Sequence, residues 1–153
     1  AFESIKLKVA DDSIYQLSED YITYLSSYNY LFDGTIELLK YLEPNYNLHI
    51  ITNGFQEVQH GKLEKSKIHR YFKTITNSEM VGVKKPNPLI FNHALELAKA
   101  TKQQSIMIGD NYEADVLGAL NMGLDAICFN YHKVDLEENI KSVDKLLELK
   151  VYF

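Results

Sequence analysis

The stretch SIMIGDNYEAD, residues 105–115, decides the fold class because an apolar strand ends within it and a helix begins. Residues 105–108 are apolar after the leading serine, which is typical of a buried strand. Gly109 and Asp110 end that strand, and a helix is predicted over 113–121. A buried strand followed directly by a helix is the repeating unit of parallel sheets.

The same kind of unit recurs along most of the chain. Strands are predicted at 48–51, 73–76, 105–108 and 126–129, and helices at 34–42, 55–67, 88–100, 113–121 and 143–149. This alternation predicts the α/β class, with a Rossmann-like, mostly parallel sheet, right-handed crossovers and helices on both faces.

The N-terminal residues show helical periodicity only. Helices are predicted near 2–9 and 13–28. We divide the chain into a helical segment, residues 1–30, and a sheet-containing core, residues 31–153. An aromatic platform for a ligand is one interpretation of the tyrosines in the helical segment. The favoured interpretation is a single buried helical stripe, because apolar side chains recur at steps of three and four at Ile14, Leu17, Tyr21, Leu25 and Tyr28.

Composition excludes several classes of function. The chain has 153 residues, of which 46% are hydrophobic and 24% charged, and this suits one compact domain. A net charge of −5 and a single arginine, Arg70, argue against a nucleic-acid partner, since duplex binding needs clustered cations. No apolar run approaches the ~18 residues of a membrane helix, so no membrane association is expected. A single cysteine, Cys128, excludes an internal disulfide and fits the reducing cytoplasm. The 5 histidines lack the spacing of zinc ligands.

Polar residues follow the predicted strands where ligands bind in an open parallel sheet, beyond the carboxyl ends of the strands. Thr52, Asn53 and Gly54 lie between a strand and a helix, so their amides and the helix N-terminus suit an anion such as phosphate. A simple turn is the alternative. Lys85 precedes Pro86 and is pushed toward extended geometry, which suits a lysine that reaches over a phosphate. An ordinary surface lysine is the alternative.

Two carboxylates flank the start of the helix that follows residues 105–108. Asp110 ends the strand and Asp115 lies in the first helical turn, so this spacing can bring both to one point. Mg²⁺ takes oxygen ligands of this kind. For Asp115 the alternative is a carboxylate that only complements the helix dipole.

In this order the three segments resemble the haloacid dehalogenase superfamily of Mg²⁺-dependent phosphohydrolases. IITNG (50–54) resembles its second motif, VKKPNPLIF (83–91) its third and GDNYEAD (109–115) its fourth. The Thr-Asn-Gly form and the FQE that follows it are most similar to the branch containing pyrimidine 5′-nucleotidases. Three ordered motifs are far more specific than any one of them.

The resemblance implies a role for each matching residue around the phosphate. Thr52 would hydrogen-bond the phosphoryl group, with Asn53 and the Gly54 backbone shaping its cradle. Lys85 would be the catalytic lysine that balances charge between the phosphate and the nucleophile.

The resemblance also implies the metal and the reaction. Mg²⁺ would be held by Asp110, with Asp115 in support. Hydrolysis would pass through an aspartyl-phosphate on a first-motif aspartate. The implied function is the hydrolysis of a small phosphorylated metabolite, with nucleoside 5′-monophosphates as the expected substrates.

The chain departs from the family at the first motif, Asp-x-Asp-x-Thr after an apolar strand. LFDGT (31–35) resembles that motif, but Leu31 stands at the nucleophile position and no apolar strand precedes it. We therefore interpret Asp33 as a helix N-cap and residues 1–28 as the last helices of an incomplete cap domain. The absent nucleophile strand is central in the family's sheet, so its absence leaves two exposed edges. We expect a truncated chain, inactive alone and completed by a missing N-terminal segment or a second chain.

Two other functions stay open at this point. One is a non-catalytic phosphate-binding or regulatory fragment, and the other is a 2-haloacid dehalogenase. A receiver domain uses similar residues in a different chain order. A dinucleotide-binding domain is not expected, because no Gly-x-Gly-x-x-Gly follows a strand.

Overall fold

The computed structural model describes residues 11–153, so the helix predicted near 2–9 lies outside the described residues. The strands are β1 (Leu48–Thr52), β2 (Phe72–Asn77), β3 (Ile106–Gly109), β4 (Asp125–Phe129) and β5 (Ser142–Val143). The α-helices are α1 (Asp11–Ser27), α2 (Thr35–Leu42), α3 (Gln56–Lys65), α4 (Ser78–Val81), α5 (Pro88–Ala98) and α6 (Gly118–Asn121). The other helical turns are η2 (His69–Tyr71), η3 (Lys102–Gln104), η4 (Tyr112–Leu117, a π-helix) and η5 (Leu146–Tyr152).

The strands confirm the predicted α/β class, because every pairing among the described residues is parallel. They form two separate sheets, however, with β1 beside β2 in one and the order β3-β4-β5 in the other. The break falls between β1 and β3, where the resemblance expects the nucleophile strand of the family. Every residue of β1 and β3 is only half-buried, whereas β4 is buried from Ala126 to Phe129. The two apolar strands at the break therefore lack the cover that a central strand usually has.

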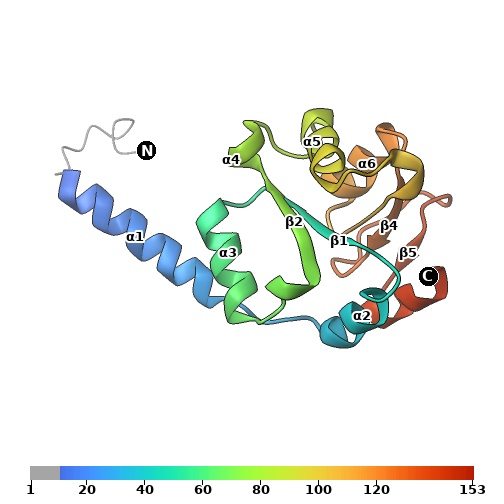
Figure 1. Cartoon of the computed structure of the whole chain (residues 1–153), viewed down its shortest axis with the longest axis horizontal. Helices are drawn as coiled ribbons and strands as arrows, with labels where there is room; N and C mark the ends of the chain where they lie inside the picture. The colour runs from blue at the N-terminus through green and yellow to red at the C-terminus, as the bar shows by residue number, and fades with distance from the viewer. Residues whose placement is uncertain (1–10) are drawn as a thin grey trace.

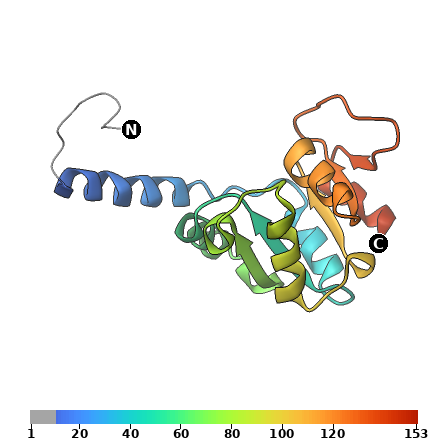
Figure 2. The same cartoon turned by 90° about the horizontal axis from the view of Figure 1, so that it is seen from above.

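Helices cover both faces of the strands, as predicted (Figures 1 and 2). On one side, Ile90 and Phe91 of α5 pack with Val116 and Ala119 against β4. On the other side, α2 and η5 pack against β4 and β5 around Ile127. A third apolar cluster, made of Leu39, Leu63, Ile68 and Tyr71, joins α2, α3 and η2, and Phe72 and Ile75 of β2 pack against it. No helix in residues 11–153 is long and apolar enough to cross a membrane.

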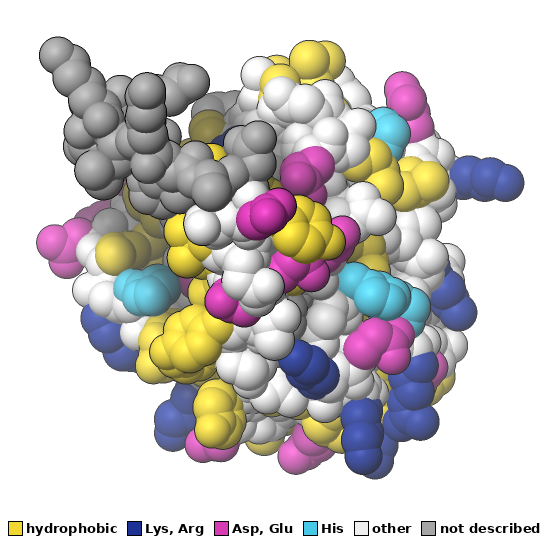
Figure 3. All heavy atoms as spheres, turned by 90° about the vertical axis from the view of Figure 1, so that its left-hand side faces the viewer, with side chains coloured by type: hydrophobic (Ala, Val, Ile, Leu, Met, Phe, Trp, Pro, Cys, Tyr) yellow, Lys and Arg dark blue, Asp and Glu magenta, His cyan; other side chains and the backbone are white. Residues whose placement is uncertain are grey.

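The predicted buried stripe on the first helix is wrong. Helix α1 runs beside α3 at its C-terminal end and projects away from the body at its other end (Figures 1 and 2). Its early turns therefore have no neighbouring element to pack against within residues 11–153, and Leu17 and Tyr21 are 54% and 52% exposed. Figure 3 shows apolar side chains left uncovered among acidic ones on this face of the molecule. The boundary between a segment 1–30 and a core 31–153 stays a prediction.

Two local predictions near the second and last helices are also wrong. Asp33 does not cap α2; Gly34 holds the N-cap position with a left-handed φ of 82°, and no side chain caps the helix. The helix predicted at 143–149 begins later, because Val143 joins the sheet and its carbonyl accepts from the Asn130 amide at 2.9 Å. The following turn, η5, begins at Leu146. The Glu148 carboxylate accepts hydrogen bonds from the backbone amides of Asp144 and Lys145, which directly precede this turn.

Candidate functional site

Lys85 lies at the centre of the candidate site. The loop after α4 carries its side chain across the carboxyl end of β1, where Nζ lies 2.7 Å from Asp115 Oδ1 and donates to the Ile51 carbonyl at 2.7 Å. The Lys85 and Asp115 side chains are only 8% and 7% exposed. A single charge buried this deeply would be costly, so each of the two compensates the other. The Lys85 side chain thus crosses the end of β1, while Lys84 beside it is exposed; that Lys85 reaches a phosphate stays a prediction.

Asn53 holds the lysine loop in place through its side-chain amide. Asn53 Oδ1 accepts from the Lys85 amide at 2.7 Å, and Asn53 Nδ2 donates to the Lys85 carbonyl at 3.1 Å. The Ser78 hydroxyl in turn donates to the Asn53 carbonyl at 3.1 Å. Both polar ends of the Asn53 side chain are therefore used in positioning Lys85. Ser78 was not predicted, because it lies in another segment and only the fold brings it here.

Thr52 and Gly54 form a tight turn at the end of β1. The Gly54 amide donates to Thr52 Oγ1 at 3.0 Å, which leaves the threonine hydroxyl proton for another acceptor. The N-terminus of α3 is also occupied, because the Gln56 amide donates to the Glu79 carboxylate at 2.7 Å. The Thr52 hydroxyl oxygen and the Glu79 carboxylate therefore compete with the anion that these amides were expected to bind. In the structure these two amides have acceptors within the chain, whereas the Thr52 hydroxyl proton and Lys85 can donate to a phosphate.

The two predicted carboxylates have different environments. Asp115 is buried, and its Oδ2 accepts the Asn111 amide at 3.3 Å in addition to the ion pair with Lys85. Gly109 is required beside it, since a Cβ at that position would overlap the Asp115 carboxylate. Asp110 is exposed at the carboxyl end of β3 and lies 3.2 Å from His132 Nε2. Asp115 is thus positioned to hold Lys85, whereas Asp110 is accessible to a ligand.

The pKa of the Cys128 thiol reflects the electrostatics of this end of the sheet. The Cys128 thiol, next to Gly109 in the strand register, has its pKa raised first by burial and then by the negative charges of Asp110 and Asp115. Both carboxylates therefore lie close enough to the Cys128 thiol to disfavour its thiolate. His132 was not singled out from the sequence, because it lies 22 positions from Asp110 and in no recognisable spacing.

The donor set around Asp110 fits a hard divalent cation. Mg²⁺ usually keeps several waters and takes one or two carboxylates together with substrate phosphate. The exposed Asp110 carboxylate offers such a ligand, while Asp115 is engaged with Lys85. These residues would hold Mg²⁺ through Asp110 and leave Asp115 in the supporting position that the resemblance assigns to it.

Parallel strands with helices on both faces, and polar site residues beyond the carboxyl ends of the strands, are typical of Rossmann-like α/β proteins. The chain belongs to the haloacid dehalogenase-like hydrolase family, whose model matches residues 2–129. The resemblance inferred from three motifs is thereby confirmed.

Similar proteins support the same family. Pyrimidine 5′-nucleotidase YjjG of Escherichia coli is 36% identical over 139 residues, which cover 88% of this chain and 62% of the relative. Pyrimidine 5′-nucleotidase PynA of Streptococcus pneumoniae is 33% identical over 121 residues, covering 78% of this chain and 51% of the relative. The magnesium-bound crystal structure of the HAD-hydrolase YfnB from Bacillus subtilis superposes with a TM-score of 0.81 at 29% identity, covering 97% of this chain and 66% of that one. The chain thus spans less than two thirds of the length of these two curated relatives.

Proposed function

We propose that this chain supplies the phosphate-binding and charge-balancing part of a Mg²⁺-dependent phosphohydrolase that cleaves small phosphomonoesters. The observation that carries the proposal is the contact of Lys85 Nζ with both Asp115 and the Ile51 carbonyl, because it joins all three motifs at one point. An ammonium group has three N–H donors, and these two acceptors use two of them. The third is left for a phosphoryl oxygen.

The site residues have different roles around the phosphate. The Thr52 hydroxyl donates to a phosphoryl oxygen, and Lys85 offers positive charge where negative charge develops in the reaction. Asp115 and Asn53 hold Lys85 in that position through its side chain and its backbone. Mg²⁺, held by Asp110, supplies further neutralisation of the phosphate charge when it is bound.

The nucleophile comes from outside residues 31–153 in this proposal. LFDGT (31–35) resembles the family's first motif, but Leu31 stands where that motif has its aspartate, and leucine cannot attack phosphorus. A strand seated in the break between β1 and β3 would place an aspartate beside Lys85 and would form the aspartyl-phosphate. We therefore propose that the chain needs that strand, from a preceding segment or a second chain, for turnover.

Nucleoside 5′-monophosphates are the substrates we favour. Two relatives that are more than 30% identical, YjjG and PynA, are named as pyrimidine 5′-nucleotidases, which supports a phosphatase over a 2-haloacid dehalogenase.

The single cysteine, Cys128, is buried on β4, in keeping with a reducing cytoplasmic compartment.

Phosphate release from uridine and thymidine 5′-monophosphates tests the proposal. We expect activity with Mg²⁺ from a protein extended N-terminally through an Asp-x-Asp strand, and none from residues 1–153. Lys85→Met in the extended protein should lower kcat by at least about 100-fold, as loss of a charge-stabilising donor does. Lys84→Met is the matched control, because this neighbouring lysine is exposed, and it should leave kcat unchanged.

Three outcomes would contradict the proposal. Phosphate binding without turnover by the extended protein would favour the non-catalytic phosphate-binding module. Halide release from 2-haloacids without phosphatase activity would favour the dehalogenase. Equal losses in Lys85→Met and Lys84→Met would remove the special role of Lys85.

A further inference from the structure

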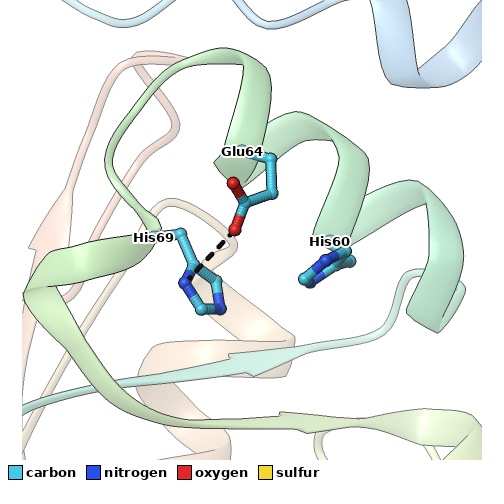
Figure 4. Close-up of side chains that lie close together, drawn as sticks. All are labelled: His60, Glu64 and His69. Carbon is cyan, nitrogen blue, oxygen red and sulfur yellow. Dashed lines mark ion pairs between the residues drawn. The ribbon is translucent and has the colours of Figure 1, made fainter.

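Three side chains with metal-binding atoms gather on the surface at the end of α3, away from the candidate phosphate site. They are His60, Glu64 and His69, and one ligand atom of each lies within 4.8 Å of the others. Figure 4 shows the two imidazole rings and the carboxylate facing the same space. No other group of three or more such residues in 11–153 has its ligand atoms this close.

The local fold places these residues together. His60 and Glu64 are four positions apart on α3 and therefore lie on one face of the helix, one turn apart. The chain then reverses at Lys67, which has a left-handed φ of 59°, and the Ile68 amide donates to the Leu63 carbonyl at 3.1 Å. This reversal turns His69, the first residue of η2, back toward α3.

Apolar packing holds this chain reversal in place. Ile68 is 8% exposed and packs with the buried Leu63 and Tyr71 in one apolar cluster. Since Leu63 and Ile68 are adjacent to Glu64 and His69, burial of the first pair fixes the backbone that carries the second. The backbone positions of Glu64 and His69 are therefore set by the core, and α3 carries His60 one turn before Glu64.

The spacing of the ligand atoms suits a tetrahedral metal. At metal–nitrogen distances of about 2.0–2.1 Å, tetrahedral ligands lie roughly 3.3–3.4 Å from one another. His69 Nδ1 already lies 3.4 Å from Glu64 Oε1. The His60 and His69 rings meet edge to face with centroids 5.4 Å apart, so small side-chain rotations bring the third ligand atom to the same distance.

We propose that His60, Glu64 and His69 bind a divalent transition metal of the Zn²⁺ type. Two imidazole nitrogens and one carboxylate oxygen are ligands that Zn²⁺ favours, and Mg²⁺ does not prefer imidazole. His60 and Glu64 are exposed, so water completes the fourth position. The ion ties the end of α3 to η2 and so fastens the crossover that connects β1 to β2. Sequence spacing did not predict this site, because the third ligand comes from the turn after the helix.

Titration with Co²⁺ tests the proposal on residues 1–153, because tetrahedral Co²⁺ absorbs visible light far more strongly than octahedral Co²⁺. Excess Mg²⁺ is present throughout to occupy Asp110. We expect one equivalent of Co²⁺ with a tetrahedral spectrum, displaced by Zn²⁺. His60→Asn and His69→Asn should each weaken binding by about tenfold or more, since even outer-shell changes cost 10–100-fold.

The controls separate this site from other histidines and carboxylates. Glu57→Gln on the same helix, His93→Asn on α5 and Asp110→Asn should all bind Co²⁺ as the unmodified chain does. A hundredfold excess of Zn²⁺ over its Kd should raise the Tm of the unmodified chain by about 5–10 °C and leave that of the His60→Asn/His69→Asn double variant unchanged. Circular dichroism without metal verifies that the variants fold. No tetrahedral spectrum in the unmodified chain, or an unaltered one in the folded double variant, would overturn the proposal.

Discussion

Removing the carboxylate of Asp115 should destabilise the chain strongly, because it leaves the ammonium of Lys85 buried without its partner. The two side chains are 8% and 7% exposed and 2.7 Å apart. Breaking a buried ion pair from one side costs about 3–5 kcal/mol. Asp115→Asn keeps the side-chain volume and an acceptor for the Asn111 amide, so this variant removes the charge with little other change.

A double-mutant cycle measured by urea unfolding isolates the pair. We expect Asp115→Asn and Lys85→Met each to lower the free energy of unfolding by about 3–5 kcal/mol. The double variant should cost about 2–3 kcal/mol less than the sum, because no unpaired charge remains. Unfolding is followed by circular dichroism, and equal m-values verify that the folded and unfolded states stay comparable.

An exposed ion pair in the same chain provides the matched comparison. Lys133 Nζ lies 2.6 Å from Asp144 Oδ1, but the side chains are 63% and 59% exposed. The cycle of Lys133→Met and Asp144→Asn should give a coupling below about 1 kcal/mol. A coupling between Lys85 and Asp115 that is as small as this one would refute the reasoning that burial makes their contact decisive.

Three further predictions concern backbone, titration and reactivity. Gly34→Ala should lower the free energy of unfolding by more than Gly82→Ala. Both glycines have left-handed φ values of about 80°, which cost an alanine roughly 1–2 kcal/mol. Only at Gly34 would the new Cβ also overlap the Leu147 side chain. Equal losses of the two variants in urea unfolding would contradict this. Burial lowers the pKa of His49 below 6.5, so the unfolded chain binds its proton more readily. Stability should therefore fall as pH drops through 6.5 toward the lowered pKa, and His49→Gln should flatten that part of the unfolding profile. Cys128 is fully buried with a raised pKa, so it should react with an aromatic disulfide reagent only as fast as the chain unfolds, which added urea would accelerate.

Local signals in the sequence were sufficient where neighbouring residues alone determine where a strand or helix begins or ends. The apolar run before Gly109 predicted β3, and Asn87 before Pro88 predicted the start of α5, whose cap the Asn87 side chain provides. The interpretation of Lys85 as a lysine that reaches over the sheet also depended on a local constraint, the proline that follows it.

Sequence patterns misled where a distant neighbour decided the outcome. The periodic stripe on α1 has the spacing of a buried face, but burial requires a second element, and the early turns of α1 have none among the described residues. Val143 has helical neighbours in sequence and yet joins β4, because an open strand edge offers it backbone hydrogen bonds. Glu79 and His132 were overlooked because their partners, Gln56 and Asp110, lie more than twenty positions away.

The break in the sheet connects the fold to the proposed chemistry. β1 ends at the site residue Thr52, and the site residue Asp110 directly follows β3. Both strands have unpaired inner edges among residues 11–153. Unpaired edges of apolar strands are prone to pair with another strand. A parallel strand in the break would satisfy both edges, cover the half-buried side chains of β1 and β3, and end beside Lys85. The same strand would therefore deliver a nucleophile to the end of the sheet where residues 11–153 already offer the Thr52 hydroxyl, the buried Lys85 cation and the accessible Asp110 carboxylate.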